Sequence, residues 1–143
     1  QITRLQLIQN AAARAVTRTK KSEHISPILE SLHWLKVNER IQYKILSLTY
    51  QALQFHQPAY IHKLLTIQTP RATRSSDYIT LERPNPPPRK ITDRSFYFHV
   101  PALWNSLPPE MRQKSTESLL KLTPKQFHSK LKTHLFTISY LPT

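Results

Sequence analysis

The chain has 143 residues, of which 21 are Lys or Arg and only 8 are Asp or Glu, so its formal net charge at pH 7 is +13. It has no cysteine and no glycine, which excludes a disulfide framework, a Cys-ligated zinc site and the glycine-rich loops that bind nucleotide phosphates. So large a net charge opposes compaction by self-repulsion unless an anion neutralises it. Nucleic acid phosphates or an anionic membrane surface are the usual neutralisers.

The first 22 residues carry basic side chains and no acid. Residues 2–18 are predicted to form a helix, because apolar side chains recur on one face and basic side chains gather on another. The apolar face comprises Leu5, Ile8, Ala12, Ala15 and Val16, and the basic residues of the segment are Arg4, Arg14, Arg18, Lys20 and Lys21. The basic face is either a solvated helix surface or a ridge that lies along a phosphate backbone.

The same acid-free segment imitates a mitochondrial transit peptide or a peptide that binds a membrane surface, which makes these minor alternatives. Otherwise a nuclear or cytoplasmic location is expected. No apolar run approaches the ~18 residues of a membrane span, so no transmembrane segment is predicted. Because the sequence begins at Gln1, we expect a fragment or a processed product.

Further helices are predicted before residue 66. Ser26-Pro27 is expected to begin a short helix, Asn38 the longest one at roughly 38–56, and Pro58 another through Leu65. The long helix has a wide apolar stripe. The stripe consists of Ile41, Ile45, Leu46, Leu48, Ala52 and Leu53. We therefore predict an N-terminal helical bundle over residues 1–65.

The composition changes over residues 66–91, which are predicted to form a Pro/Arg-rich extended linker. Within it, Tyr78–Leu81 alternates as a short strand does. A lone strand needs a partner, and the one candidate for a β-hairpin is Phe96–Val100, which could equally be helical. Arg89 and Lys90 follow a proline run and form either a phosphate-contact patch or a merely solubilising pair.

Residues 92–143 are predicted to form a C-terminal helical segment that packs on the first bundle. Thr123-Pro124 is expected to begin the last helix. Its inward positions are Phe127, Leu131 and Leu135, and its polar positions include Lys130 and Lys132. The predicted fold is thus mainly α, a small helical bundle with a Pro-rich extended segment and one short β-hairpin.

Several aromatic side chains are candidates for stacking on nucleic acid bases. Trp34, Trp104 and Phe96 are expected in the core instead, because a small domain has few other large apolar groups. Tyr97 is expected at the surface, since it lies close to the basic residue Arg94. The other candidates are Tyr43, Tyr50 and Phe98.

No catalytic residue, metal site or cofactor is predicted. Polymerase chemistry needs adjacent carboxylates that hold two metal ions, whereas Asp77 and Asp93 are far apart in the sequence. Two histidine pairs are six positions apart, a spacing that would place the partners on different sides of a helix. These pairs are His56 with His62 and His128 with His134.

Several stretches together resemble the extreme C-terminal region of the reverse transcriptase polyprotein of LINE-type (non-LTR) retrotransposons, especially the chicken-repeat and LINE-two groups. The resemblance covers nearly the whole chain. It rests on residues 4–14 (RLQLIQNAAAR), 31–35 (SLHWL), 40–46 (RIQYKIL), 48–53 (LTYQAL), 93–96 (DRSF), 101–108 (PALWNSLP) and 127–136 (FHSKLKTHLF). The chain departs from its relatives at Thr17-Arg18, where they often carry glycine, and at Lys36, where they often carry proline.

The resemblance implies a thumb and the segment after it, with the catalytic fingers and palm lying upstream. It implies no enzymatic activity for this region itself. The partners would be template RNA or target DNA, gripped through phosphates, and the upstream palm domain. The expected contact residues are Arg4, Arg14, Arg18, Lys20, Lys21, Arg89, Lys90, Arg94, Tyr97, Lys130 and Lys132. The alternative is a domesticated, retrotransposon-derived protein–protein interaction module.

Overall fold

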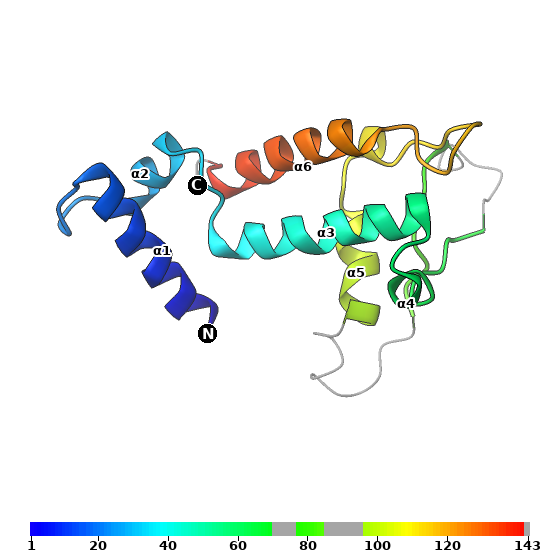
Figure 1. Ribbon diagram of the computed structural model, residues 1–143, viewed down its shortest axis with the longest axis horizontal. Coiled ribbons are helices and arrows are strands. Elements are labelled where there is room, and N and C mark those ends of the chain that lie inside the picture. Colours follow the sequence, from blue (N-terminus) through cyan, green and yellow to red (C-terminus); the bar gives the residue numbers. More distant parts are fainter. Residues whose placement is uncertain (70–76, 85–95, 142–143) are drawn as a thin grey trace. The chain divides into compact units, whose positions relative to one another are not determined.

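The computed structural model describes residues 1–69, 77–84 and 96–141, and this part of the chain is mainly helical, as predicted (Figure 1). The chain divides into two compact units, one formed by Gln1–Lys44 with Leu131–Thr143 and the other by Ile45–Lys130. The helices are α1 (Ile2–Thr17), α2 (Ile25–Ser31), α3 (Val37–Phe55), α4 (Ala59–His62), α5 (Phe96–Asn105) and α6 (Pro124–Ser139), with a 3-10 turn, η3 (Pro109–Met111). The unit boundaries fall inside α3 and α6, so the first unit combines the two ends of the sequence, whereas the second is one continuous segment.

Helix α1 packs through the buried Ala13 and through polar side chains, and not through its predicted apolar face. The Gln6 side-chain oxygen accepts a 2.9 Å hydrogen bond from the backbone N–H of Val37, and the Gln9 amide donates a 2.8 Å bond to the carbonyl oxygen of Leu35. The predicted apolar face is open to solvent, with half or more of the side chains of Leu5 and Ile8 exposed. The helix was therefore predicted correctly, but its packing face was not.

Arg18 ends α1 in the left-handed conformation, with φ at 55°. The carbonyl oxygen of Arg14 accepts hydrogen bonds from the N–H groups of Arg18 and Thr19. This is the usual way for a helix to end on glycine, but here the residue carries a Cβ, which costs about 1–2 kcal/mol. His33 and His56 also have positive φ, at 57° and 58°.

Helix α2 begins at Ile25, two residues before Pro27, which was the predicted first helical residue. Its N-cap residue is His24, and no side chain caps it, so the expected Ser26 cap was wrong. Pro27 still fits, because N–H groups in the first turn of a helix have no intrahelical partner. Helix α3 lies close to its predicted bounds, and its buried positions include Leu46 and Leu53.

Aromatic side chains form the core of the Ile45–Lys130 unit. Tyr50 and Phe127 stack with ring centroids 4.3 Å apart, and Trp104 lies 5.8 Å from Phe127. The indole N–H of Trp104 donates to the carbonyl oxygen of Ile79, and the Tyr50 hydroxyl to that of Leu122. Trp104 was predicted to be a core residue. Tyr50 was a candidate for stacking on a base, but it is buried in the core and does not offer a free face to a base.

The described residues 77–84 belong to that core and are not a linker. Ile79 and Leu81 are 1% exposed, and the Asn105 side chain pairs with both the N–H and the carbonyl oxygen of Leu81 at 2.9 Å. The segment forms isolated antiparallel bridges, Ile67 with Leu81 and Tyr78 with Gln113. The proposed hairpin partner, Phe96–Val100, is instead the start of α5. The rest of the predicted linker, apart from residues 66–69, lies outside the described residues.

Helix α6 begins as the sequence predicted. The Thr123 hydroxyl accepts a hydrogen bond from the N–H of Gln126, and the Gln126 side chain accepts one from the N–H of Thr123. This reciprocal pair satisfies two N–H groups that the helix itself cannot. The predicted inward residues Phe127, Leu131 and Leu135 are at most 1% exposed.

Candidate nucleic-acid interface

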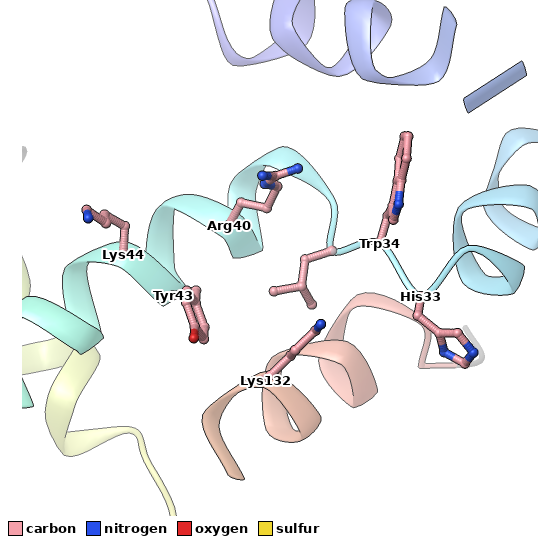
Figure 2. A pocket seen from close by; sticks show the side chains of 7 residues that line it. His33, Trp34, Arg40, Tyr43, Lys44 and Lys132 are labelled. Atoms are coloured by element: carbon pink, nitrogen blue, oxygen red, sulfur yellow. The ribbon is translucent and has the colours of Figure 1, made fainter. Parts of the chain in front are cut away.

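A cavity of about 520 Å³ lies within the unit formed by Gln1–Lys44 and Leu131–Thr143 (Figure 2). It combines three cationic side chains, from α3 and α6, with two aromatic ones, and the described residues of its lining include no carboxylate. The lining residues are His33, Trp34, Leu35, Arg40, Tyr43, Lys44 and Lys132. In Figure 2 the end of the Lys132 side chain lies between Tyr43 on α3 and the loop that carries His33.

The loop between α2 and α3 is held at several points, and these fix the position of Trp34. The N–H of Trp34 bonds to the carbonyl oxygen of Leu29 at 3.0 Å, while its own carbonyl oxygen accepts a 2.5 Å bond from the Tyr140 hydroxyl. Leu35 is 8% exposed and its carbonyl oxygen accepts the bond from Gln9. The Trp34 side chain, in contrast, is only half-buried and forms part of the cavity wall.

The cations of α3 reach the cavity because of helix geometry. Arg40, Tyr43 and Lys44 are spaced by three and four positions, which places them on one face of a helix. Among the described residues, no hydrogen bond or ion pair involves the side chain of Arg40, Lys44 or Lys132. Like charges that line one cavity repel one another, so the site favours an anion.

Tyr140 lies behind the loop in an electrostatically distinct environment. Burial raises the pKa of Tyr140 to about 12, and the nearby carboxylates of Glu30 and Glu39 contribute in the same direction. The Lys36 ammonium lies 5.2 Å from the centre of the Tyr140 ring. Glu30 and Glu39 are not among the described residues that line the cavity.

The predicted basic ridge of α1 does not form as a continuous stripe. Arg14 is half-buried, and its guanidinium donates a 3.1 Å hydrogen bond to the carbonyl oxygen of Glu23, which ties down the turn after the helix. Arg18 leaves the helix at its left-handed C-terminus. Arg4, Lys20 and Lys21 are exposed, and none of these five residues lines the cavity.

The remaining predicted contact residues fall in other places. Tyr97 is 42% exposed, as expected, and lines a separate cavity of about 260 Å³ that includes both Glu82 and Arg83. Lys130 is exposed on α6 but belongs to the Ile45–Lys130 unit, whereas Lys132 belongs to the unit that contains the cavity. Arg89, Lys90 and Arg94 lie outside the described residues.

Of the seven described lining residues, Lys132 alone was among the predicted contacts. Arg40 and Lys44 carried a usable signal, because two cations four positions apart on a predicted helix share a face. Trp34 was expected in the core, and no local pattern distinguishes a core indole from one in a cavity wall. Its place depends on the turn at His33 and on the hydrogen bond from Tyr140.

The histidines are arranged differently from the prediction. His56 follows the end of α3 and His62 ends α4, so the two are not on one helix, and their rings stack with centroids 4.3 Å apart. In the described part of the chain, no group of three or more His, Asp or Glu side chains could hold a metal ion.

No helix among residues 1–69, 77–84 and 96–141 combines the length and the apolar character needed to cross a membrane. Comparison of the chain with protein families, curated proteins and solved structures gives no match.

Proposed function

We propose that the chain is a non-catalytic, nucleic-acid-binding C-terminal region of a LINE-type reverse transcriptase, and that it contacts RNA or DNA through phosphates. The observation that carries the proposal is the cavity lined by Arg40, Lys44 and Lys132 together with Trp34, with no carboxylate among its described lining residues. Phosphate oxygens are the natural counter-charge for Arg and Lys side chains, and such contacts supply most of the affinity for nucleic acid.

The resemblance to the retrotransposon proteins supports the same site. All of the lining residues lie inside stretches that carry the resemblance: residues 31–35, 40–46 and 127–136. The stretch 127–136 is distant in the sequence from the other two, yet all three supply lining residues of one cavity. In the resembling family this region corresponds to the thumb, which fits a role in gripping a strand without breaking bonds.

The exposed cations at the start of α1 and around its C-terminal end extend the proposed contact set. Arg4, Arg18, Lys20 and Lys21 are open to solvent and can approach phosphates. Arg14 is a weaker candidate, because its guanidinium is already bonded to the backbone at Glu23. We therefore place the cavity cations first and the α1 cations second.

A charge-matched pair of variants tests the proposal. Arg40→Gln, Lys44→Gln and Lys132→Gln together remove the cavity cations, while Lys63→Gln, Lys121→Gln and Lys125→Gln remove three exposed cations from the other unit. Fluorescence anisotropy with labelled RNA and DNA oligonucleotides measures the affinity. At about 0.5 kcal/mol for each contact, we expect the cavity variant to bind about tenfold more weakly.

The control variant is expected to lose less than about threefold, since charge at a distance is largely screened. An equal loss in both variants would show that net charge and not the cavity governs binding. Absence of binding to any RNA or DNA by the wild-type chain would refute the proposed function itself.

One observation favours the alternative of a protein–protein interaction module. The solvent-facing side of α1 presents large apolar side chains, and Ile8 and Val16 are 65% and 64% exposed. A second copy of the chain is the simplest partner to test, by sedimentation velocity over a range of concentrations. Association that Ile8→Gln abolishes, together with no affinity for nucleic acid, would favour the interaction module.

A further inference from the structure

The cavity has features that phosphate binding alone does not require. We infer that it accepts an unpaired nucleotide, with the base against the Trp34 ring and the phosphate beside the cations, so that the chain selects single-stranded over double-stranded nucleic acid. The inference rests on the proposed function and adds the class of strand that is bound.

The size and shape of the cavity favour a single nucleotide. Its volume of about 520 Å³ falls within the ~300–1,000 Å³ that is typical of small-molecule sites. A base within a duplex is paired and stacked on its neighbours, so it enters a concave site only after it has been unstacked, at a cost of a few kcal/mol. An unpaired base has no such barrier.

The two kinds of lining residue match the two parts of a nucleotide. Arg40, Lys44 and Lys132 supply positive charge, whereas Trp34 and Leu35 supply apolar surface. A simple anion site needs only the cations. An aromatic ring beside a basic groove is the arrangement by which proteins bind single strands with little sequence preference.

Trp34 is also held in place before a ligand arrives. Its backbone is fixed by the hydrogen bonds to Leu29 and from Tyr140, while its half-buried side chain remains partly accessible. A ring that is already ordered loses little conformational entropy when a base stacks on it. Tyr97 is a weaker candidate for base stacking, because its cavity includes the carboxylate of Glu82, which repels a phosphate.

Tryptophan fluorescence tests the inference directly, because the chain has only two tryptophans. Trp104 is 0% exposed and belongs to the other unit, so a base that stacks on a tryptophan reaches Trp34. The full chain is titrated with an oligothymidylate, with an abasic strand that has the same number of phosphates, and with a duplex. We expect saturable quenching by the oligothymidylate and none by the abasic strand or the duplex.

Trp34→Leu and Trp34→Phe supply the affinity test, with anisotropy as the readout. Loss of base stacking should weaken oligothymidylate binding about tenfold in Trp34→Leu and less in Trp34→Phe, with no change in abasic-strand binding. Both variants should lose the quenching. Fluorescence of the buried Trp104 and circular dichroism report whether each variant remains folded. If Trp34→Leu does not remain folded, the binding of the three strands to the wild-type chain tests the inference.

Quenching of equal size by the abasic strand, by the duplex or by heparin would overturn the inference, because a base would then not be required. The same holds if Trp34→Leu weakens binding of both strands equally. In either result the proposed phosphate binding would still stand. Failure of every strand to bind would instead refute the proposed function.

Discussion

The hydroxyl of Tyr140 donates a 2.5 Å hydrogen bond to the carbonyl oxygen of Trp34, which lies 106 positions earlier in the chain. A second contact lies beside it, since the rings of His33 and Phe136 are 5.8 Å apart, and Phe136 packs on Tyr140 at 4.8 Å. The C-terminal end of the chain thus holds the loop that presents Trp34 to the cavity.

Tyr140→Phe should loosen this loop without removing the aromatic ring. Loss of one hydrogen bond to a half-buried carbonyl group should lower the free energy of unfolding by about 1 kcal/mol. Affinity for a single strand should fall a few-fold, because the Trp34 loop is less ordered. Urea denaturation and anisotropy measure the two effects. Tyr60→Phe is the matched control, since Tyr60 is 71% exposed, and equal effects of both substitutions would contradict the role of Tyr140.

The stability of the fold should decrease in alkaline solution. Burial and the carboxylates of Glu30 and Glu39 raise the pKa of Tyr140 to about 12, whereas a tyrosine in the unfolded chain ionises near 10. The unfolded state therefore releases its proton first, so this contribution to stability is complete below about pH 10 and is lost as the pH rises toward 12. Burial raises the pKa of Tyr50 too, so Tyr50 adds to the effect.

Urea midpoints measured between pH 8 and pH 11 test this expectation. The midpoint of the wild-type chain should fall more steeply with pH than that of Tyr140→Phe, because lysine ionisation and Tyr50 are common to both. Parallel curves for the two proteins would show that Tyr140 does not carry the effect.

Glycine at position 18 should stabilise the chain. Arg18 has φ at 55°, a conformation that glycine adopts without the steric penalty of a Cβ. After allowance for the greater freedom of glycine in the unfolded state, Arg18→Gly should raise the free energy of unfolding by about 0.5–1 kcal/mol. Arg18→Ala keeps a Cβ and should show no such gain. If the two variants are equally stable, the left-handed conformation is not responsible.

The buried guanidinium of Arg112 should be essential to the core of the Ile45–Lys130 unit. It is 5% exposed, donates to the carbonyl oxygens of Leu107 and Ile79 at 3.0 and 3.1 Å, and lies 4.7 Å from the centre of the Tyr78 ring. Burial lowers the pKa of the Arg112 guanidinium, and Tyr78 acts in the opposite direction. Arg112→Ala leaves the carbonyl oxygen of Leu107 without this partner, while that of Ile79 keeps the Trp104 indole N–H, and should lower the free energy of unfolding by about 2–4 kcal/mol.

Chemical denaturation of Arg112→Ala, with Arg83→Ala as control, measures this loss. Arg83 is exposed, so its removal should change stability by less than about 0.5 kcal/mol. Arg112→Lys should lie between the two, because an ammonium cannot reproduce the planar fork of donors. A small effect of Arg112→Ala would show that water satisfies the carbonyl groups instead.

Local patterns predicted the helices well, because the signals of a helix lie within a few residues. The Thr123 and Gln126 side chains of α6 cap its start as their spacing indicated. The packing face of α1 was not predictable in this way. Its amphipathic pattern located an apolar face, but the hydrogen bonds of Gln6 and Gln9 to a distant loop determine which face packs.

Contacts between residues far apart in the sequence also explain the other differences between the predicted and the observed structure. The alternation over Tyr78–Leu81 correctly placed Ile79 and Leu81 on one side, yet only the folded chain shows that Ile67 and Gln113 pair with this segment. The cavity, too, was only partly predictable from local sequence. The spacing of Arg40 and Lys44 was readable from the sequence, whereas their meeting with Lys132 depends on the tertiary fold.

The salt dependence of single-strand binding tests the central claim most directly. Each phosphate neutralised on a single strand contributes about −0.7 to the slope of log Kobs against log salt concentration. The wild-type slope should be steep, and removal of Arg40, Lys44 and Lys132 should make it shallower by about 2, while the Lys63, Lys121 and Lys125 control keeps the wild-type value. A flat dependence for the wild-type chain, or an unchanged slope in the cavity variant, would contradict the account.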